Sequence, residues 1–179
     1  LYLDGKSVKH GFQSISSEIA LIPQDPEIFQ ETIMGNITLG ADYEMAEVLK
    51  YTDMACFTDV VMNLPNKFDS MIKEKGVNLS GGEKQRLALA RGLLASRDKA
   101  IVLLDEPTSS VDVVNEERIF WNIFEVFADK AIICSLHGLH LLPMFDRIYL
   151  FDNGKIIAKG SFNELLASSV EFQKIWEEF

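Results

Sequence analysis

The sequence predicts an α/β fold in which strands of a mostly parallel sheet alternate with amphipathic helices. Residues 101–104 form an unbroken run of branched apolar residues, which is typical of a parallel strand buried on both faces. Residues 18–22 and 131–135 are short apolar runs of the same kind. Between them, residues 81–94 and 113–128 carry apolar residues at helical spacing. This alternation predicts an α/β sheet core.

Composition limits the class of protein. With 179 residues, the chain is expected to be one domain or most of one, and 47% apolar and 25% charged residues are ordinary for a soluble globular protein. The net charge of −10 argues against a general nucleic-acid-binding surface. Cys56 and Cys134 make no disulfide framework and are interpreted as small core residues in a reducing compartment. No apolar run reaches the roughly 18 residues that cross a bilayer, so we expect any work at a membrane to be done from the aqueous side.

The N-terminal residues are predicted to form a strand over 1–6 that closes at the turn pair Asp4-Gly5. The chain opens on this strand as if entered midway, which suggests a piece of a longer polypeptide. Residues 5–7, Gly-Lys-Ser, imitate the end of the phosphate-binding loop G-x-x-x-x-G-K-[ST]. The residues before them have the composition of a strand, and residues 8–17 make a poor first helix turn. We therefore expect no P-loop in this chain.

Acidic and amide side chains follow two of the predicted strands. Asp105 and Glu106 come directly after residues 101–104, where an open α/β sheet binds its ligands. The first acid can hold Mg²⁺ and the second can direct a water molecule. Gln24 lies in the rigid turn Pro23-Gln24-Asp25-Pro26, and its carbonyl oxygen could join the same shell. The alternatives are that the acids begin a solvated loop and that Gln24 is an ordinary turn residue.

His137 follows the strand predicted over residues 131–135, so its imidazole is expected at the same edge of the sheet. Taken alone, His137 could equally be a surface or packed residue. His140, three residues later, could suggest a metal pair. No cysteine or acid nearby completes a set of ligands, so we do not expect a metal at these histidines.

The start of the helix predicted from residue 81 has an unusual composition. Ser80 and Glu83 form a capping box, the serine as N-cap and the glutamate three residues later. Gly81 and Gly82 are poor helix formers, but they leave the first N–H groups bare. Exposed N–H groups at a helix start bind phosphate. The alternative is a simple capped helix, which would leave both glycines unexplained.

The remaining segments are assigned by pattern. Phe29, Ile33, Ile37 and Leu39 have helical spacing interrupted at Gly35-Asn36, and their face could belong to the core or to a docking groove. Residues 43–64 predict two helices broken near Cys56, residues 68–72 a short extended piece, and residues 73–76 a polar loop. Asp152-Asn153-Gly154 predicts a hairpin turn between residues 147–151 and 155–159. Helices are expected over 162–167, capped by Ser161 with Glu164, and over 170–179.

Four elements in order resemble the ATP-binding-cassette (ABC) ATPase family, and especially the nucleotide-binding domains of exporters. They are Gln24 after Ile-Pro, the run Leu-Ser-Gly-Gly-Glu at 79–83, residues 101–106 with Ser110-Val-Asp112, and His137. The resemblance covers essentially the whole chain and implies a P-loop NTPase-like fold. It also implies an α/β core of residues 1–29 and 97–179 and an inserted helical signature subdomain of residues 30–96.

The resemblance implies a role for each of these residues, with ATP and Mg²⁺ as substrate and cofactor. Gln24 would touch Mg²⁺ beside the contact with the membrane domain, and Asp105 would act on Mg²⁺. Glu106 would be the general base, and His137 would contact the γ-phosphate. Asp112 would cross the dimer interface. The signature residues Ser80, Gly81 and Gly82, with Glu83 among the nucleotide-binding residues, would hold ATP bound by the opposite subunit.

The resemblance also implies partners and a location. We expect a second nucleotide-binding domain, in a homodimer or heterodimer, and the transmembrane domain of an exporter, at the cytoplasmic face of the plasma (inner) membrane. The family's Walker A loop and adenine-stacking aromatic lie upstream of the strand that opens this chain. The fragment alone is therefore expected to be soluble, neither to bind nor to hydrolyse ATP appreciably, and to self-associate through bared apolar surface.

Two rival interpretations remain open. A degenerate or regulatory cassette would bind nucleotide in a dimer without turnover, but Glu106 and His137 argue against it. A soluble ABC ATPase of the DNA-repair type shares the signature helix, but the acidic charge and the exporter-like segment 23–36 argue against it. Lys75 and Gly138 stand where many exporters have arginine.

Overall fold

A computed structural model describes residues 2–3, 5–7, 11–73 and 78–178. The chain divides into two compact units, residues 1–135 and 136–179, and each is described by itself. Among the described residues, no helix is both long and apolar enough to cross a lipid bilayer. The polar loop predicted over 73–76 lies mostly outside the described residues.

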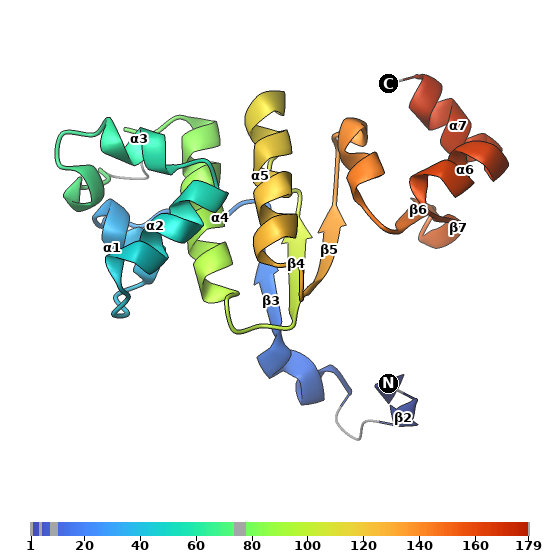
Figure 1. The fold of residues 1–179 in the computed structure, drawn as a ribbon, viewed down its shortest axis with the longest axis horizontal. Helices are drawn as coiled ribbons and strands as arrows, with labels where there is room; N and C mark the ends of the chain where they lie inside the picture. The colour runs from blue at the N-terminus through green and yellow to red at the C-terminus, as the bar shows by residue number, and fades with distance from the viewer. Residues whose placement is uncertain (1, 4, 8–10, 74–77, 179) are drawn as a thin grey trace. The chain divides into compact units, whose positions relative to one another are not determined.

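The first unit is built on a three-stranded parallel sheet with the order β3 (Ile19–Ile22), β4 (Ile101–Asp105) and β5 (Ala131–Ser135) (Figure 1). The register pairs Leu21 with Leu103 and Leu103 with Ile133, so these three side chains share one face. All three strands were predicted from their apolar runs, and the α/β class with a parallel sheet is confirmed. Because β4 lies in the middle, its carboxyl end is flanked by the ends of the other two strands.

Helices cover one face of this sheet. Both crossovers, through α4 (Gly81–Ala95) and α5 (Val113–Val126), step in the same direction along the sheet. Right-handed connections therefore place the two helices on the same side. Val102 and Leu104 are buried beneath them. The contact is close, because a Cβ at Gly92 of α4 would lie 2.7 Å from Ile22 Cδ1.

The opposite face of the sheet is open in the described part of the chain. Leu21 is 63% exposed and Ile133 is 62% exposed, and Leu103 between them is half-buried. The prediction that residues 101–104 are buried on both faces is therefore wrong for the described residues, as is the prediction that 131–135 is a buried strand. Within the first unit, the described helices α4 and α5 both lie on one side of the sheet, so alternate residues of each strand stay accessible. The exposed apolar surface that we expected from the sequence includes Leu21 and Ile133 on this open face.

Between residues 30 and 80 the regular elements described are helical: α1 (Ile33–Thr38), α2 (Met45–Met54), α3 (Thr58–Met62) and the 3₁₀ turn η2 (Lys67–Asp69). Both α1 and α2 pack on α4, around buried Ile33, Val48 and Leu87. The break predicted near Cys56 is confirmed, with Cys56 at a φ of 51°. The proposed subdomain of residues 30–96 stays a prediction.

Two local predictions in this segment are wrong. The interruption predicted at Gly35-Asn36 does not occur, because α1 runs through both residues. The buried Asn36 amide bonds the N–H and carbonyl of Phe29, which anchors the chain on the helix. The extended piece predicted over 68–72 is reduced to an isolated bridge between Thr32 and Met71, preceded by η2.

The N-terminal residues form a short antiparallel pair, β1 (Tyr2–Leu3) and β2 (Lys6–Ser7), around the turn that the sequence predicted. A 3₁₀ helix, η1 (Gly11–Glu18), then leads into β3. No helix was expected in that segment, because glycine and serine are common there.

The second unit contains η4 (Leu139–Met144), the antiparallel hairpin β6 (Ile148–Asp152) and β7 (Lys155–Gly160), and the helices α6 (Phe162–Ser168) and α7 (Val170–Glu177). Asn153 and Gly154 have φ of 45° and 75°, which confirms the predicted turn. The capping box of Ser161 and Glu164 is also confirmed. Ile148, Leu165 and Phe172 form the core of this unit.

Candidate functional site

The acidic pair lies where β4 ends. Asp105 is exposed and Glu106 half-buried, and Ser135 at the end of β5 binds both. The Ser135 hydroxyl donates to Asp105 Oδ1 at 2.7 Å and accepts from the Glu106 N–H at 3.0 Å. The pair is thus tied to the neighbouring strand.

Gln24, in the loop after β3, reaches the same place. Its Nε2 donates a hydrogen bond to Glu106 Oε2, although 82 residues separate the two in sequence. The ends of all three parallel strands therefore supply a side chain to one site: Gln24 from β3, the acids from β4 and Ser135 from β5. This convergence is where open α/β sheets bind ligands.

The donor set of this edge fits Mg²⁺. Asp105 offers a carboxylate, and Gln24 can offer its amide oxygen because its nitrogen is the end that bonds Glu106. Mg²⁺ usually takes one or two carboxylates together with water and substrate phosphates. No cluster of three or more histidine, cysteine or acidic residues that could hold a metal occurs in the described ranges. This edge is therefore suited to a Mg²⁺ ion that is also coordinated by a phosphate ligand. The described residues do not form a complete set of protein ligands around the ion.

The start of α4 has the predicted capping box. Ser80 Oγ accepts from the Glu83 N–H at 3.3 Å, and the Glu83 carboxylate accepts from the Ser80 N–H at 2.7 Å. The two glycines between them have different surroundings. A Cβ at Gly81 would meet nothing within 4 Å, whereas one at Gly82 would lie 2.6 Å from the Ser110 carbonyl oxygen. Packing therefore accounts for Gly82, and Gly81 is left exposed at the helix start.

The structure adds Gln85, which sequence reasoning passed over. Its buried side chain links α4 to the loop after Glu106: Nε2 donates to the Glu106 carbonyl at 3.2 Å and to Ser109 Oγ at 3.0 Å. Its Oε1 accepts from the Ser110 N–H at 2.7 Å. Gln85 lies three residues after Gly82, so the two share a helix face, and this spacing was an available signal.

Ser135 was also missed. The register pairs it directly with Asp105, so its side chain is expected beside the acid once the strand pairing is known. A hydroxyl at the last position of a strand that follows the acidic strand was the signal in the sequence.

Asp112 lies seven residues after Asp105 and caps α5. Its carboxylate accepts from the Asn115 N–H at 3.0 Å and from Asn115 Nδ2 at 2.7 Å. These two bonds hold the pKa of Asp112 below its usual value. The carboxylate is therefore ionised and exposed at the start of a helix.

His137 belongs to the second unit, where it lies exposed just before η4. Its place at the sheet edge, predicted from the strand before it, stays a prediction. The structure thus brings together Gln24, Asp105 and Glu106, and connects the start of α4 to them through Gln85.

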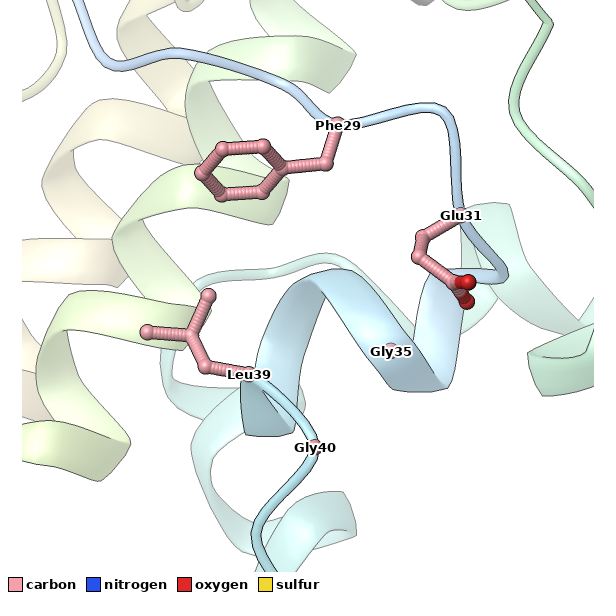
Figure 2. Close-up of a pocket in the computed structure, with 5 residues that line it drawn as sticks. All are labelled: Phe29, Glu31, Gly35, Leu39 and Gly40. Carbon is pink, nitrogen blue, oxygen red and sulfur yellow. The ribbon is translucent and has the colours of Figure 1, made fainter.

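A separate pocket of about 490 Å³ lies in the segment that follows Gln24 (Figure 2). It is lined by Phe29, Glu31, Gly35, Leu39 and Gly40. The sequence did not decide whether the apolar residues of this segment belong to the core or to a docking groove. In the structure Ile33 and Ile37 belong to the core, whereas Phe29 is 43% and Leu39 61% exposed. Arg91 of α4 stacks over the Phe29 ring at 5.3 Å and donates to the Glu27 carbonyl at 2.7 Å.

Comparisons with known proteins agree on one family. The model of the family "ABC transporter" matches residues 1–109. An ABC-type transporter MDR1 of Aureobasidium melanogenum is 39% identical over 171 residues, which are 93% of this chain and 12% of the relative. An ATP-dependent lipid A-core flippase of Photobacterium profundum is 35% identical over 169 residues, 93% of this chain and 28% of the relative.

The solved structure of a bacterial Atm1-family ABC exporter with ATP bound superposes with a TM-score of 0.86 and 32% identity. The match covers 99% of this chain and 31% of that one. The chain thus spans only about an eighth to a third of the proteins that it matches. The resemblance seen in its motifs is confirmed: the chain belongs to the ABC transporter family.

Proposed function

We propose that this chain is the main part of the ATP-hydrolysing cassette of an ABC exporter, which couples ATP hydrolysis to transport of a substrate across a membrane. The observation that carries the proposal is the meeting of Gln24, Asp105 and Glu106 at one sheet edge, with the signature helix α4 bonded to the same loop. The exporters and the flippase among the matched proteins support this direction of transport.

In this proposal each group at the sheet edge has one task. Asp105, oriented by Ser135, and the amide oxygen of Gln24 hold Mg²⁺, which when bound neutralises charge on the phosphates. Glu106 accepts a proton from the attacking water and so directs it at the γ-phosphate. The bond from Gln24 to Glu106 orients the carboxylate.

The other motif residues act across an assembly of two cassettes. The N–H groups at the exposed start of α4, with Ser80, Gly81, Gly82 and Glu83, hold the γ-phosphate of ATP bound by the second cassette. Asp112 lies at the interface between the cassettes, and His137 contacts the γ-phosphate. Each ATP would thus lie between the acids of one copy and the helix start of the other.

The membrane domain is the second partner that we propose, and it places the cassette at the cytoplasmic face of the membrane. Phe29 and Leu39 form an exposed apolar pair directly after the Gln24 loop, and Figure 2 shows both side chains extending toward the same side. A contact there would connect the membrane domain to the site through only a few residues. It would lie at the junction between the core segment 1–29, which ends at Phe29, and the proposed helical subdomain of residues 30–96, which is inserted before the core segment 97–179.

A polypeptide limited to residues 1–179 is proposed to lack appreciable turnover. These residues contain no G-x-x-x-x-G-K-[ST] loop, which supplies the lysine and the backbone cradle for the β- and γ-phosphates. Activity therefore belongs to the full-length protein.

The test is Glu106→Gln in the full-length protein, measured as phosphate release and as ATP binding. Loss of the general base should lower the rate at least about 100-fold while ATP binding is retained. Glu125→Gln, on the exposed side of α5, is the matched control and should keep the wild-type rate. Glu106→Gln with the wild-type rate would refute the proposal, and a wild-type protein that binds ATP without releasing phosphate would favour a regulatory cassette.

A further inference from the structure

Gln85 has a buried side-chain amide whose nitrogen and oxygen both form hydrogen bonds to the same loop. Only 7% of it is exposed, and its three hydrogen bonds go to Glu106, Ser109 and Ser110, at 3.2, 3.0 and 2.7 Å. It therefore connects the first turns of α4 to the residues that directly follow the acidic pair.

The backbone at Glu106 needs such support. Its φ is 44°, in the left-handed region that residues with a side chain rarely adopt. Ser135 binds its N–H, and its carbonyl accepts from Gln85 Nε2 and, at 3.3 Å, from the Ser109 N–H. Such conformations persist only where the surroundings hold them, so losing the amide would let this peptide rotate and move the carboxylate.

A second contact joins the helix to the same loop. Gly82 approaches the Ser110 carbonyl so closely that a Cβ would lie 2.6 Å from it. With the Ser110 N–H bonded to Gln85, both peptide groups of Ser110 face α4. The start of α4 and the loop after Glu106 are thus coupled in position.

We propose that Gln85 is a positioning residue for Glu106. The start of α4 faces the ATP bound by the partner cassette. Through Gln85, the same helix fixes the position of the Glu106 carboxylate, which acts on the ATP bound by its own chain. The inference rests on the proposed function, and it makes the occupancy of one ATP site a determinant of the geometry of the general base in the other.

The test is a double-mutant cycle in the full-length protein. Gln85→Met keeps the length of the side chain and removes all three bonds. We expect the maximal rate of ATP hydrolysis to fall about tenfold or more, because small misplacements of a catalytic group are costly. The ATP concentration at half-maximal rate should change less than about twofold. In the Glu106→Gln background, Gln85→Met should change the residual rate less than about twofold, because groups that act as a unit are not additive.

A purely structural role gives a different pattern. It would lower the rate by the same factor in both backgrounds, and that result would overturn the proposal. Thr52→Val is the control, since it removes a buried hydroxyl bonded to Leu49 and Thr58, away from the loop. It should lower the melting temperature and leave both rates unchanged. Equal rate losses in Thr52→Val and Gln85→Met would also overturn the proposal.

If Gln85→Met does not accumulate as folded protein, Ser109→Ala decides. Ser109 is exposed, and its loss removes one of the three bonds. We expect a rate loss of about threefold with the same non-additivity, and the wild-type rate would overturn the proposal. A wild-type rate in Glu106→Gln would instead refute the proposed function itself. A strong loss in Glu106→Gln beside a harmless Gln85→Met would refute this inference alone.

Discussion

The two glycines that open α4 differ enough in their surroundings for a matched pair of substitutions, Gly81→Ala and Gly82→Ala. Both add one methyl group to the first turn of the same helix. At Gly82 that methyl would lie 2.6 Å from the Ser110 carbonyl oxygen, a backbone atom that cannot turn away as a side chain can. At Gly81 it would meet nothing within 4 Å.

The magnitudes follow from these contacts. Forcing an extra methyl into a packed contact costs about 1–3 kcal/mol, and replacing glycine by alanine in a helix returns at most about 1 kcal/mol. Gly82→Ala should therefore be destabilised by about 1 kcal/mol and Gly81→Ala stabilised by up to about 1 kcal/mol. For a domain of this size, a difference of about 2 kcal/mol separates the melting temperatures by about 4–8 °C.

The assay is differential scanning fluorimetry of the full-length protein, together with its ATPase rate. We expect Gly82→Ala to melt several degrees below Gly81→Ala. Gly81→Ala should nevertheless lose activity, because its methyl group obstructs the exposed N–H groups proposed to hold phosphate. Equal melting temperatures, or a higher one for Gly82→Ala, would refute the packing argument. A fully active Gly81→Ala would refute the proposed phosphate contact.

Ser135→Ala removes the hydroxyl that binds both acidic residues and should lower the ATPase rate about tenfold; the wild-type rate would contradict this. Burial raises the pKa of Cys134 to about 12. Its thiol should therefore be alkylated by iodoacetamide more slowly than that of Cys56, and the alkylation rate should still increase between pH 8 and 10. An alkylation rate that levels off below pH 10 would show that the pKa is not raised. Leu39→Ser should weaken the stimulation of ATPase activity by transported substrate, because it removes apolar surface from the proposed contact with the membrane domain. Met62, which is 42% exposed on α3, lies outside that contact, so Met62→Ser should leave the stimulation unchanged. Equal effects of the two substitutions would refute the proposed contact.

Local sequence patterns predicted the helix starts and the hairpin well. Ser80 with Glu83 and Ser161 with Glu164 form their capping boxes as expected, because the signal and the hydrogen bonds lie within one helical turn. The turn at Asn153 and Gly154 is equally local, since it depends on the φ that these residue types tolerate. Such interactions need no knowledge of the rest of the fold.

Predictions that depended on distant partners were less complete. Asn36 looked like a helix interruption, but its bonds to Phe29 stabilise α1. The runs of residues 101–104 and 131–135 indicated strands correctly, yet their composition did not show which face a helical layer would cover. Each of these outcomes depends on tertiary packing.

The candidate site shows the same division. Asp105, Glu106 and Gln24 were found because their position after a strand carries meaning in the sequence alone. Gln85 and Ser135 carry weaker signals, a spacing of three residues from Gly82 and a hydroxyl at a strand end, and their role becomes clear only when the strand register and the face of α4 that meets the loop are known. Glutamine in a helix interior is ordinary, and only its burial against Glu106 singles it out.

We propose that ATP lies between the acidic sheet edge of one cassette and the start of α4 of another. The most direct measurement is a structure of the full-length Glu106→Gln protein with ATP and Mg²⁺. We expect γ-phosphate oxygens within hydrogen-bond distance of the Ser80 and Gly81 region of one copy, and Mg²⁺ bound by Asp105 of the other. ATP bound away from Asp105, or α4 starts that face no nucleotide, would contradict it.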